Sequence, residues 1–526
     1  MAASIILEHD ARLSESLLWQ LQRDYYRRRG VEPWSDDTVP HYITTNPTSA
    51  AAFARVIEGW LRDGALVDRA APLTVLELGA GTGRMGWHLV RCLDELQARG
   101  LLPRFRYVLS DVSQASLAWW RDHPQLAPLL ARGVMDVARV DAEASGAAAP
   151  IELEVSGERL EALANPLVVI ATYLFDSLRC DAFAVRGGAV FEKRLTLAVP
   201  AGAPAPGDPE QLVSSEQTWR LVPVATGRYA EPELDALLRS YAALDGDAEL
   251  TFPIAGLRCL RRLERAAGGR MLVLASDKGF VEPAAMRGRS EPDITTHGSV
   301  SLPVNFHAII EDARRRGAVA LTTRPTLTRL ACVAVVHGAA RHDETRAAFR
   351  EAVVRAGPDD WYALKKAFER RFHDASLEEL LALLRWGRGD DNVMRSAAPT
   401  LFDRIAGASP GQRDELGAVL ATVERSYFWV GEAADLPFLV GIARHLAGDE
   451  AGARASFRRA LELFERAPRP CYRLVLGGMW IGDADGPGGD RVRALEADAG
   501  YLEARAKLLT ISPDDPVWQR EFPGER

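Results

Sequence analysis

Short apolar runs alternate with helical patterns through the first two thirds of the chain. Seven runs of five to seven residues are bounded by glycine, proline or polar turns, which is typical of buried strands. These runs cover residues 73–78, 105–110, 134–140, 167–171, 271–275, 318–323 and 330–336. Apolar side chains recur at helical spacing between several of them, at 84–99, 114–121 and 305–316. The alternation predicts an α/β domain with a mostly parallel, doubly wound sheet.

The fourth and fifth predicted strands are separated by a long insertion, residues 183–250. It contains two segments with the alternation of hairpin strands, VFEKRLTLAVP and SEQTWRLVPV, and a helical pattern at 231–244. Ligands bind at the carboxyl ends of the strands in such sheets, so we expect the insertion to form a cap that selects the substrate. A passive surface decoration is the alternative. The last two apolar runs predict an antiparallel hairpin that completes the sheet by about residue 338.

Residues 1–72 precede the first predicted strand. A helical pattern at 11–29 ends in three arginines, where cations suit the helix dipole. The next segment is rich in proline, threonine and aspartate, which predicts a loop leading into a helix near Ser49. We therefore expect a helical arm and then a loop. The loop either folds over a neighbouring site as a lid or is an ordinary surface connection.

Helical patterns follow one another without strands from residue 343 onwards. They cover 343–355, 360–372, 376–386, 397–405, 410–427, 435–447 and 449–464. The last two resemble one tetratricopeptide unit, because small residues fall where paired helices approach closely. One unit is fewer than the three that a solenoid needs, so the others are degenerate repeats or plain helices. We predict an all-helical domain at 343–510 that holds a protein or peptide partner.

Length and charge limit the kind of protein. A chain of 526 residues exceeds one compact core, so we expect two or three domains. Hydrophobic residues make up 47% and charged residues 26% of the chain, which is typical of globular proteins. The formal net charge of −8 argues against nucleic-acid binding, which favours a basic surface.

The spacing of the cysteines and the hydropathy of the chain predict its cellular compartment. No apolar run approaches the roughly 18 residues of a membrane span, and the N-terminus becomes charged too early for a signal peptide. The five cysteines are scattered, and neither they nor the ten histidines show metal-ligand spacing. These features predict a cytoplasmic protein with reduced thiols, no disulfide framework and no metal site.

A glycine turn after the first strand carries the clearest chemical signal. It reads Glu-x-Gly-x-Gly-x-Gly from Glu77 to Gly83. Glycines let the chain turn tightly and let a ligand approach the backbone N–H groups and the helix N-terminus. A dinucleotide fingerprint needs glycine where this chain has Arg84, so a nicotinamide enzyme is the least favoured class. The turn resembles the first motif of class I S-adenosylmethionine (SAM) methyltransferases, with an ordinary glycine-rich turn as the alternative.

Acidic residues follow the next two predicted strands. Asp111 ends the second strand, where a carboxylate accepts hydrogen bonds from ribose hydroxyls. Asp141 ends the third strand, and the resemblance to methyltransferases implies that a carboxylate there meets the adenine amino group. The residues predicted to bind the cofactor are Thr44, Glu77, Gly79, Ala80, Gly81, Gly83, Asp111, Val112, Asp141, Ala142 and Ala171.

Six stretches share a pattern with one methyltransferase family. They are Tyr42-Ile-Thr44, Glu77 to Arg84, Asp111-Val-Ser113, Ala171 to Leu178, Asp277-Lys-Gly279 and Asp293 to His297. Together they resemble the MidA-like methyltransferases, which include a mitochondrial complex I assembly factor known to methylate a protein arginine. The resemblance covers roughly residues 20–336 and implies a Rossmann-like class I sheet with SAM as the cofactor.

The fourth strand is followed by Thr172-Tyr173, where the family has Asn-Glu. A guanidinium acceptor keeps its charge in proteins and benefits from carboxylates that orient it. Losing the family's acid therefore puts arginine methylation in doubt, although Asp176 supplies one carboxylate.

The catalytic candidates are Tyr173, Asp176 and His297, and Asp293 falls in the same predicted cleft. Tyr173 is alternatively an aromatic side chain packed over the cofactor, Asp176 a cap of a turn, and His297 a structural hydrogen-bond partner. The neighbouring Asp277-Lys278 pair is interpreted as a turn with an exposed charge.

Two functions of different class fit these observations. The first is a SAM-dependent methyltransferase whose protein, peptide or small-molecule acceptor lies between the Rossmann-like core and the cap. A small-molecule acceptor would need a pocket closed by the 183–250 insertion. The second is a non-catalytic SAM-fold scaffold that binds protein partners through its C-terminal helical repeats.

Overall fold

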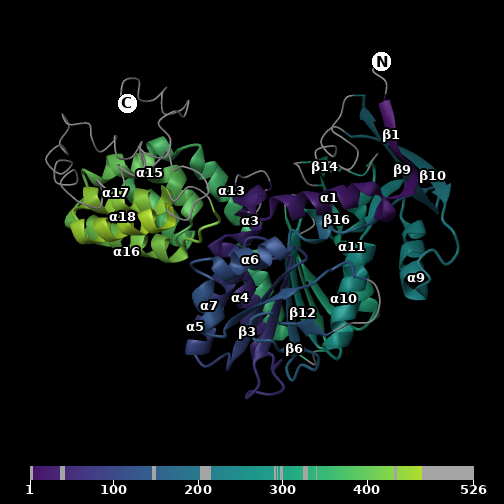
Figure 1. Ribbon diagram of the computed structural model, residues 1–526, viewed down its shortest axis with the longest axis horizontal. Helices are drawn as coiled ribbons and strands as arrows, with labels where there is room; N and C mark the ends of the chain where they lie inside the picture. The colour runs from purple at the N-terminus through teal and green to yellow at the C-terminus, as the bar shows by residue number, and fades with distance from the viewer. Residues whose placement is uncertain are drawn as a thin grey trace. The chain divides into compact units, whose positions relative to one another are not determined.

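The computed structural model describes residues 4–35, 39, 42–144, 150–201, 215–289, 292, 294–296, 300–323, 330–338, 341–431 and 435–464. The chain divides into two compact units, Met1–Asp360 and Trp361–Arg526 (Figure 1). Every strand among the described residues belongs to the first unit, and the described part of the second unit is helical.

The central sheet of the first unit has seven strands in the order β17-β18-β12-β7-β2-β3-β4. They are β2 (Leu73–Leu78), β3 (Phe105–Asp111), β4 (Met135–Arg139), β7 (Leu167–Thr172), β12 (Met271–Asp277), β17 (Val319–Thr322) and β18 (Ala331–His337). Strands β12, β7, β2, β3 and β4 run parallel, whereas β18 is antiparallel to both β12 and β17. All seven apolar runs are therefore strands of this sheet, and the predicted closing hairpin is confirmed.

Helices cover both faces of the central sheet, because successive side chains of a strand point to opposite sides. The helices are α5 (Arg84–Ala98) on one face and α10 (Ile254–Ala266) and α11 (Phe306–Arg315) on the other. Leu76 of β2 shares a core cluster with side chains of α10 and α11. The next residue, Glu77, points to the other face, where its carboxyl lies beside Gly86 of α5.

A second, antiparallel sheet is built mainly from the insertion. Its strands are β1 (Ser4–Arg12), β8 (Asp181–Arg186), β9 (Ala189–Pro200), β10 (Glu216–Pro223) and β11 (Ala248–Phe252). The order is β1-β9-β8-β11, and β10 also pairs with β9. The insertion adds the helix α9 (Pro232–Ser240). The arm at 1–72 is therefore not purely helical, because its first described residues form β1 along an edge that β9 offers.

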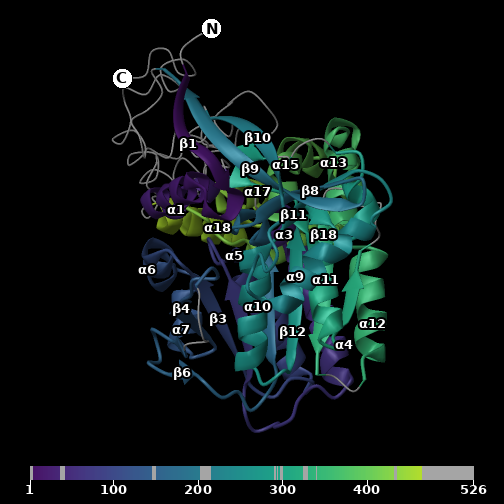
Figure 2. The same ribbon diagram turned by 90° about the vertical axis from the view of Figure 1, so that its right-hand side faces the viewer.

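Helix α1 (Leu17–Arg29) connects the two sheets. Its N-cap is Ser16, whose side chain accepts a hydrogen bond from Leu18 N. Trp19 of α1 packs in one cluster with Leu195 and Leu197 of the second sheet. Figure 2 shows α1 below the second sheet and above the central sheet. The second sheet therefore holds α1 over the ends of the central strands.

The predicted loop after α1 contains short helices. They are α2 (Glu32–Ser35) and α3 (Tyr42–Thr45), and α4 (Pro47–Arg62) follows close to the predicted start near Ser49. Asn46 caps α4 by accepting a hydrogen bond from Ser49 N. The residues between α2 and α3 other than Val39 lie outside the described part of the chain.

Helix α12 (Asp343–Phe349) belongs to the first unit, because Asp63 after α4 accepts hydrogen bonds from Glu344 N and Thr345 N. The helical unit therefore begins at Trp361, and the predicted boundary at 343 was too early. The helices from this boundary on are α13 (Pro358–Glu369), α14 (Leu377–Trp386), α15 (Asp391–Ile405), α16 (Pro410–Ser426), α17 (Asp435–Ala447) and α18 (Glu450–Phe464). The tetratricopeptide character of α17 and α18 stays a prediction. Among the described residues, no helix has the length and apolarity needed to cross a membrane.

Candidate active site

The glycine turn between β2 and α5 has the backbone that its sequence requires. Gly79, Gly81 and Gly83 have φ angles of +61°, +54° and +82°, in the left-handed region that side chains disfavour. A Cβ atom at Gly79 would lie 2.8 Å from Leu174 Cδ1. The indole N–H of Trp120 donates to the Gly81 carbonyl oxygen at 2.9 Å and holds the turn in position.

Glu77 supports this turn from the end of β2. Its side chain is 1% exposed, and the Tyr107 hydroxyl donates to its Oε2 at 2.8 Å. Burial raises the pKa of Glu77 to about 8, against the opposing effect of hydrogen bonds from Tyr107 and Gly86 N–H. Glu77 is therefore mostly protonated at neutral pH, and its carboxyl lies under the turn. Whether it also contacts a cofactor stays a prediction.

Asp111 joins the ends of β3 and the glycine turn. Its Oδ1 accepts a hydrogen bond from Ser113 N at 2.9 Å, and Oδ2 accepts one from Gly81 N at 3.4 Å. Burial raises the pKa of Asp111, whereas these N–H donors favour the charged form. The carboxylate is thus held in a fixed position beside the turn.

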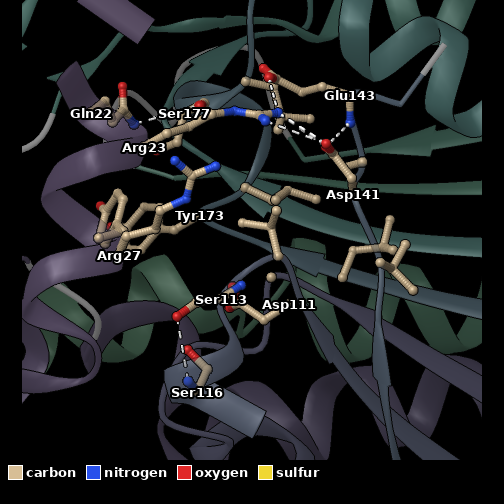
Figure 3. Close-up of a pocket in the computed structure, with 18 of the residues that line it drawn as sticks. Gln22, Arg23, Arg27, Asp111, Ser113, Ser116, Asp141, Glu143, Tyr173 and Ser177 are labelled. Carbon is tan, nitrogen blue, oxygen red and sulfur yellow. Dashed lines mark hydrogen bonds and ion pairs between the residues drawn. The ribbon is translucent and has the colours of Figure 1, made fainter. Parts of the chain in front are cut away.

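A first cleft lies at the carboxyl ends of β2, β3 and β4 (Figure 3). Five of the predicted cofactor-binding residues line it: Gly79, Asp111, Val112, Asp141 and Ala142. The opposite wall comes from α1 and the turn after it, with Trp19, Gln22, Arg23, Tyr26, Arg27, Gly30 and Trp34. Sequence reasoning missed the part of this wall that α1 provides, although α1 carries polar and aromatic residues at adjoining positions, whereas Trp34 of α2 belongs to the segment for which a lid was one of two predictions.

An arginine of α1 occupies the end of this cleft where adenine was expected. Figure 3 shows Arg23 reaching across to Asp141 and Glu143. Its Nη2 donates to Asp141 Oδ1 at 3.0 Å, and Glu143 N donates to the same oxygen at 2.8 Å. The Asp141 carboxylate is therefore already paired, so it acts at least in part by holding α1 in place.

A second cavity adjoins the first. It is lined by Tyr26, Trp34, Val39, Thr44, Thr45, Glu77, Gly79, Ala80, Gly81, Thr82, Thr172, Tyr173, Asp176, Ser177, Lys278 and Ser301. Tyr26, Trp34, Gly79, Tyr173 and Ser177 line both cavities. A ligand lying along the glycine turn would therefore enter both.

Tyr173 stands between the two cavities in a strained backbone conformation. Its φ angle is +47°, which is uncommon for a bulky residue and is typical of residues at functional sites. Tyr173 N donates to the Ser276 carbonyl oxygen at 2.9 Å, so the neighbouring strand β12 holds the turn. Trp34 covers the glycine turn, since a Cβ at Gly81 would lie 3.4 Å from its ring, and it stacks on Tyr26 at 5.5 Å.

Asp176 lines the second cavity and lies beside the carboxyl group of Asp277. Asp277 is fully buried at 0% exposed, so its interpretation as an exposed charge was wrong. Its Oδ2 accepts from Asp176 N at 3.1 Å and its Oδ1 from Lys278 N at 2.8 Å. Burial raises the pKa of Asp176 to about 6. Burial and the neighbouring Asp176 charge together raise the pKa of Asp277 well above its usual value.

Some predicted residues lie elsewhere. Gly83 faces Trp120 and Leu126, and Ala171 is 1% exposed in the core, so neither lines the two cavities. His297 and Asp293 fall outside the described residues, and their predicted roles stay predictions. No cluster of three or more potential metal ligands occurs in the part of the chain that the structure describes.

The strand order, the antiparallel β18 and the glycine turn define an α/β fold of the methyltransferase-like class. Two solved structures from Burkholderia thailandensis were found to be similar. One, an uncharacterized ACR of the COG1565 superfamily, has 16% identity and a TM-score of 0.40 over 63% of this chain and 89% of its own. The other, a COG1565 superfamily member described as a methyltransferase candidate bound to S-adenosyl-homocysteine, has 15% identity and a TM-score of 0.37 over 64% and 95%. No protein-family model matches the sequence, and no similar curated protein was found.

Proposed function

We propose that the protein is a SAM-dependent methyltransferase whose cofactor lies along the glycine turn and whose acceptor enters the second cavity. The observation that carries this proposal is that Gly79 and Tyr173 line two adjoining cavities at the carboxyl ends of the central strands. Ligands of such sheets bind at this edge, near the point where the strand order reverses.

The residues of the two cavities fit the parts of SAM. Asp111 offers a fixed carboxylate for ribose hydroxyls, and Val112 and Ala142 offer apolar surface for the adenine ring. The backbone of Gly79 to Gly81 and the side chain of Thr44 would hold the amino-acid end. The glycines themselves add no side chain between this backbone and the cavity, whose lining includes Gly79 and Gly81.

Bound SAM supplies an electrophilic methyl group, and the chain's own residues orient the acceptor and exclude water. Tyr26, Trp34 and Tyr173 place aromatic surface at the junction of the two cavities, where water would compete with the acceptor. Asp176 is the carboxyl of the second cavity that holds or takes up a proton near neutral pH, since burial raises its pKa to about 6.

Calorimetric titration of the full chain with SAM and S-adenosyl-homocysteine (SAH) tests the proposal. We expect dissociation constants in the micromolar range or tighter. Gly81→Arg should abolish binding, because φ is +54° and a Cβ would already touch Trp34. Gly407→Arg is the matched control, since nothing lies within 4 Å of a Cβ there. If the wild-type chain binds neither compound, the proposal is refuted.

A scaffold without catalysis is the second candidate, and Tyr173, which stands where the MidA-like methyltransferases have an acid, favours it. In either case we propose that the helical unit recruits a protein or peptide partner. Incubation with methyl-labelled SAM and cell extract separates the candidates. Label on one defined acceptor that disappears with Asp176→Ala supports the enzyme. Partners captured without any labelled acceptor support the scaffold.

A further inference from the structure

Two ionised carboxyls at the second cavity would outnumber the cations among the cavity's described residues. Asp176 is 7% exposed and lines the cavity, and Asp277 lies behind it at 0%. Lys278 is the charged neighbour whose field lowers the pKa of Asp176, so it compensates one of the two carboxylates. Glu77 also lines the cavity, but its carboxyl is bonded to Tyr107 and carries a proton at neutral pH. One negative charge of the Asp176–Asp277 pair is therefore left over.

A proton fills this imbalance. Two adjacent buried carboxyls cannot both ionise at low cost, so the pair retains one proton near neutral pH. Ser177 Oγ donates to Asp176 Oδ1 at 2.9 Å, and backbone N–H groups of Asp176 and Lys278 donate to Asp277. Burial and the Asp176 charge raise the pKa of Asp277 well above its usual value, so the retained proton lies on Asp277, and Asp176 presents the edge of the pair that meets the cavity.

The other walls of the cavity also favour a cation. Tyr26, Trp34 and Tyr173 line it, and Tyr26 and Trp34 stack at 5.5 Å with an interplanar angle of 16°. The faces of aromatic rings attract ammonium groups, and this attraction is independent of the carboxyl pair. Among the described residues that line the cavity, Asp176 presents a free carboxyl edge, whereas the Glu77 carboxyl is bonded to Tyr107, so the geometry suits a compact ammonium better than a planar guanidinium that two carboxylates would flank.

We infer that the second cavity binds its methyl acceptor as an aliphatic amine, whose ammonium group lies against Asp176 and displaces the proton shared with Asp277. The inference rests on the proposed function. The displaced proton passes to solvent, after which two carboxylates face Lys278 and the bound ammonium, and the charges balance. Before it can accept a methyl group, the ammonium must return one proton to this carboxylate pair, which frees the nitrogen lone pair. An alcohol or carboxylic acid acceptor would leave the shared proton in place.

Sinefungin provides a probe that needs no identified acceptor. It is an analogue of SAM in which an amine-bearing carbon replaces the methylsulfonium centre, and SAH lacks that amine. The full chain is titrated calorimetrically with both compounds at pH 7 in two buffers of different ionisation enthalpy, which measures affinity and proton release together. We expect sinefungin to bind about tenfold or more tightly than SAH, as for a charge-assisted hydrogen bond, and to release a proton that SAH does not.

Three variants locate the effect. Asp176→Asn should bring the preference for sinefungin over SAH to about one. Asp277→Asn should keep the preference but lose the proton release, because Asp176 then ionises alone. Asp68→Asn is the matched control and should behave as wild type, because Asp68 is exposed and lines neither cavity.

The outcomes separate this inference from the proposed function. If wild type binds SAH but shows no preference for sinefungin, or keeps the preference in Asp176→Asn, the amine subsite is wrong and the cofactor proposal stands. Preference without proton release in wild type overturns the displacement of a shared proton. If wild type binds neither compound, the proposed function fails and this inference with it.

Discussion

Replacing Glu77 with glutamine should remove a loss of stability that the first unit suffers as the pH rises from 4.5 to 8. Glu77 is 1% exposed, and burial raises its pKa to about 8, whereas the unfolded chain has a value near 4.5. The folded state therefore holds a proton between these two values that the unfolded state has lost. An acid with a raised pKa gives stability that is fully present below the unfolded pKa and is lost as the pH rises towards the folded pKa.

The size of the effect follows from the two pKa values. Stability falls by about 1.4 kcal/mol for each pH unit between roughly 4.5 and 8, which amounts to about 5 kcal/mol in total. Glutamine matches the protonated acid in shape, and its oxygen still accepts from Tyr107 and Gly86 N–H. The variant does not titrate. At pH 7.5 it should therefore be more stable than wild type by about 4 kcal/mol, relative to their difference at pH 4.5.

Urea unfolding followed by hydrogen exchange and mass spectrometry measures this difference. Peptides from β2 and β3 report on the first unit, and peptides from α16 report on the second unit as an internal control. The difference in unfolding free energy between Glu77→Gln and wild type should grow steadily from pH 5 to 7.5. It should level off above pH 8. A difference that stays constant over this range would refute the protonated state of Glu77.

Three further predictions concern other contacts. Arg23→Gln removes the hydrogen bonds to Asp141 that hold α1 over the first cleft. SAH should therefore dissociate several times faster from this variant in stopped-flow measurements. An unchanged dissociation rate would argue against α1 as a wall of the cleft. Asp63→Ala removes the acceptor of the first N–H groups of α12 and should cost about 1 to 2 kcal/mol in urea unfolding at pH 7. The pKa of Asp63 is lowered mainly by its bonds to Thr345 against the effect of burial, so the wild-type advantage should vanish as the pH falls below about 3.8. Ser376→Ala breaks the capping box of α14 and should destabilise the second unit by about 1 kcal/mol without changing SAH binding.

The central sheet was predictable because its strands are buried on both faces. Such strands read as continuous apolar runs, and the turns that separate them carry glycine and polar residues. The glycine turn was predictable for the same reason, since its φ angles admit few other residues. Both features depend on residues that are close together in the sequence.

The second sheet and the walls of the site depend on distant contacts. Strand β1 contains charged residues and pairs with β9, and the bond from Asp10 N to Thr196 Oγ1 spans 186 positions. Asp277 follows an apolar run, where an exposed turn is the usual outcome. Its burial depends on the N–H of Asp176, which is 101 positions away. Neither contact can be predicted from the residues near it in the sequence.

The pairing of β1 with β9 also sets an order for the growing chain. Helix α1 can be held in place only when the second sheet exists, yet α1 and β1 are synthesised long before β9. At the usual 5 to 20 residues per second, the 186 positions between Asp10 and Thr196 correspond to roughly 10 to 40 s of translation. During that interval the surface of β9 against which Trp19 packs does not yet exist, so α1 reaches its final position only after β9 has been made.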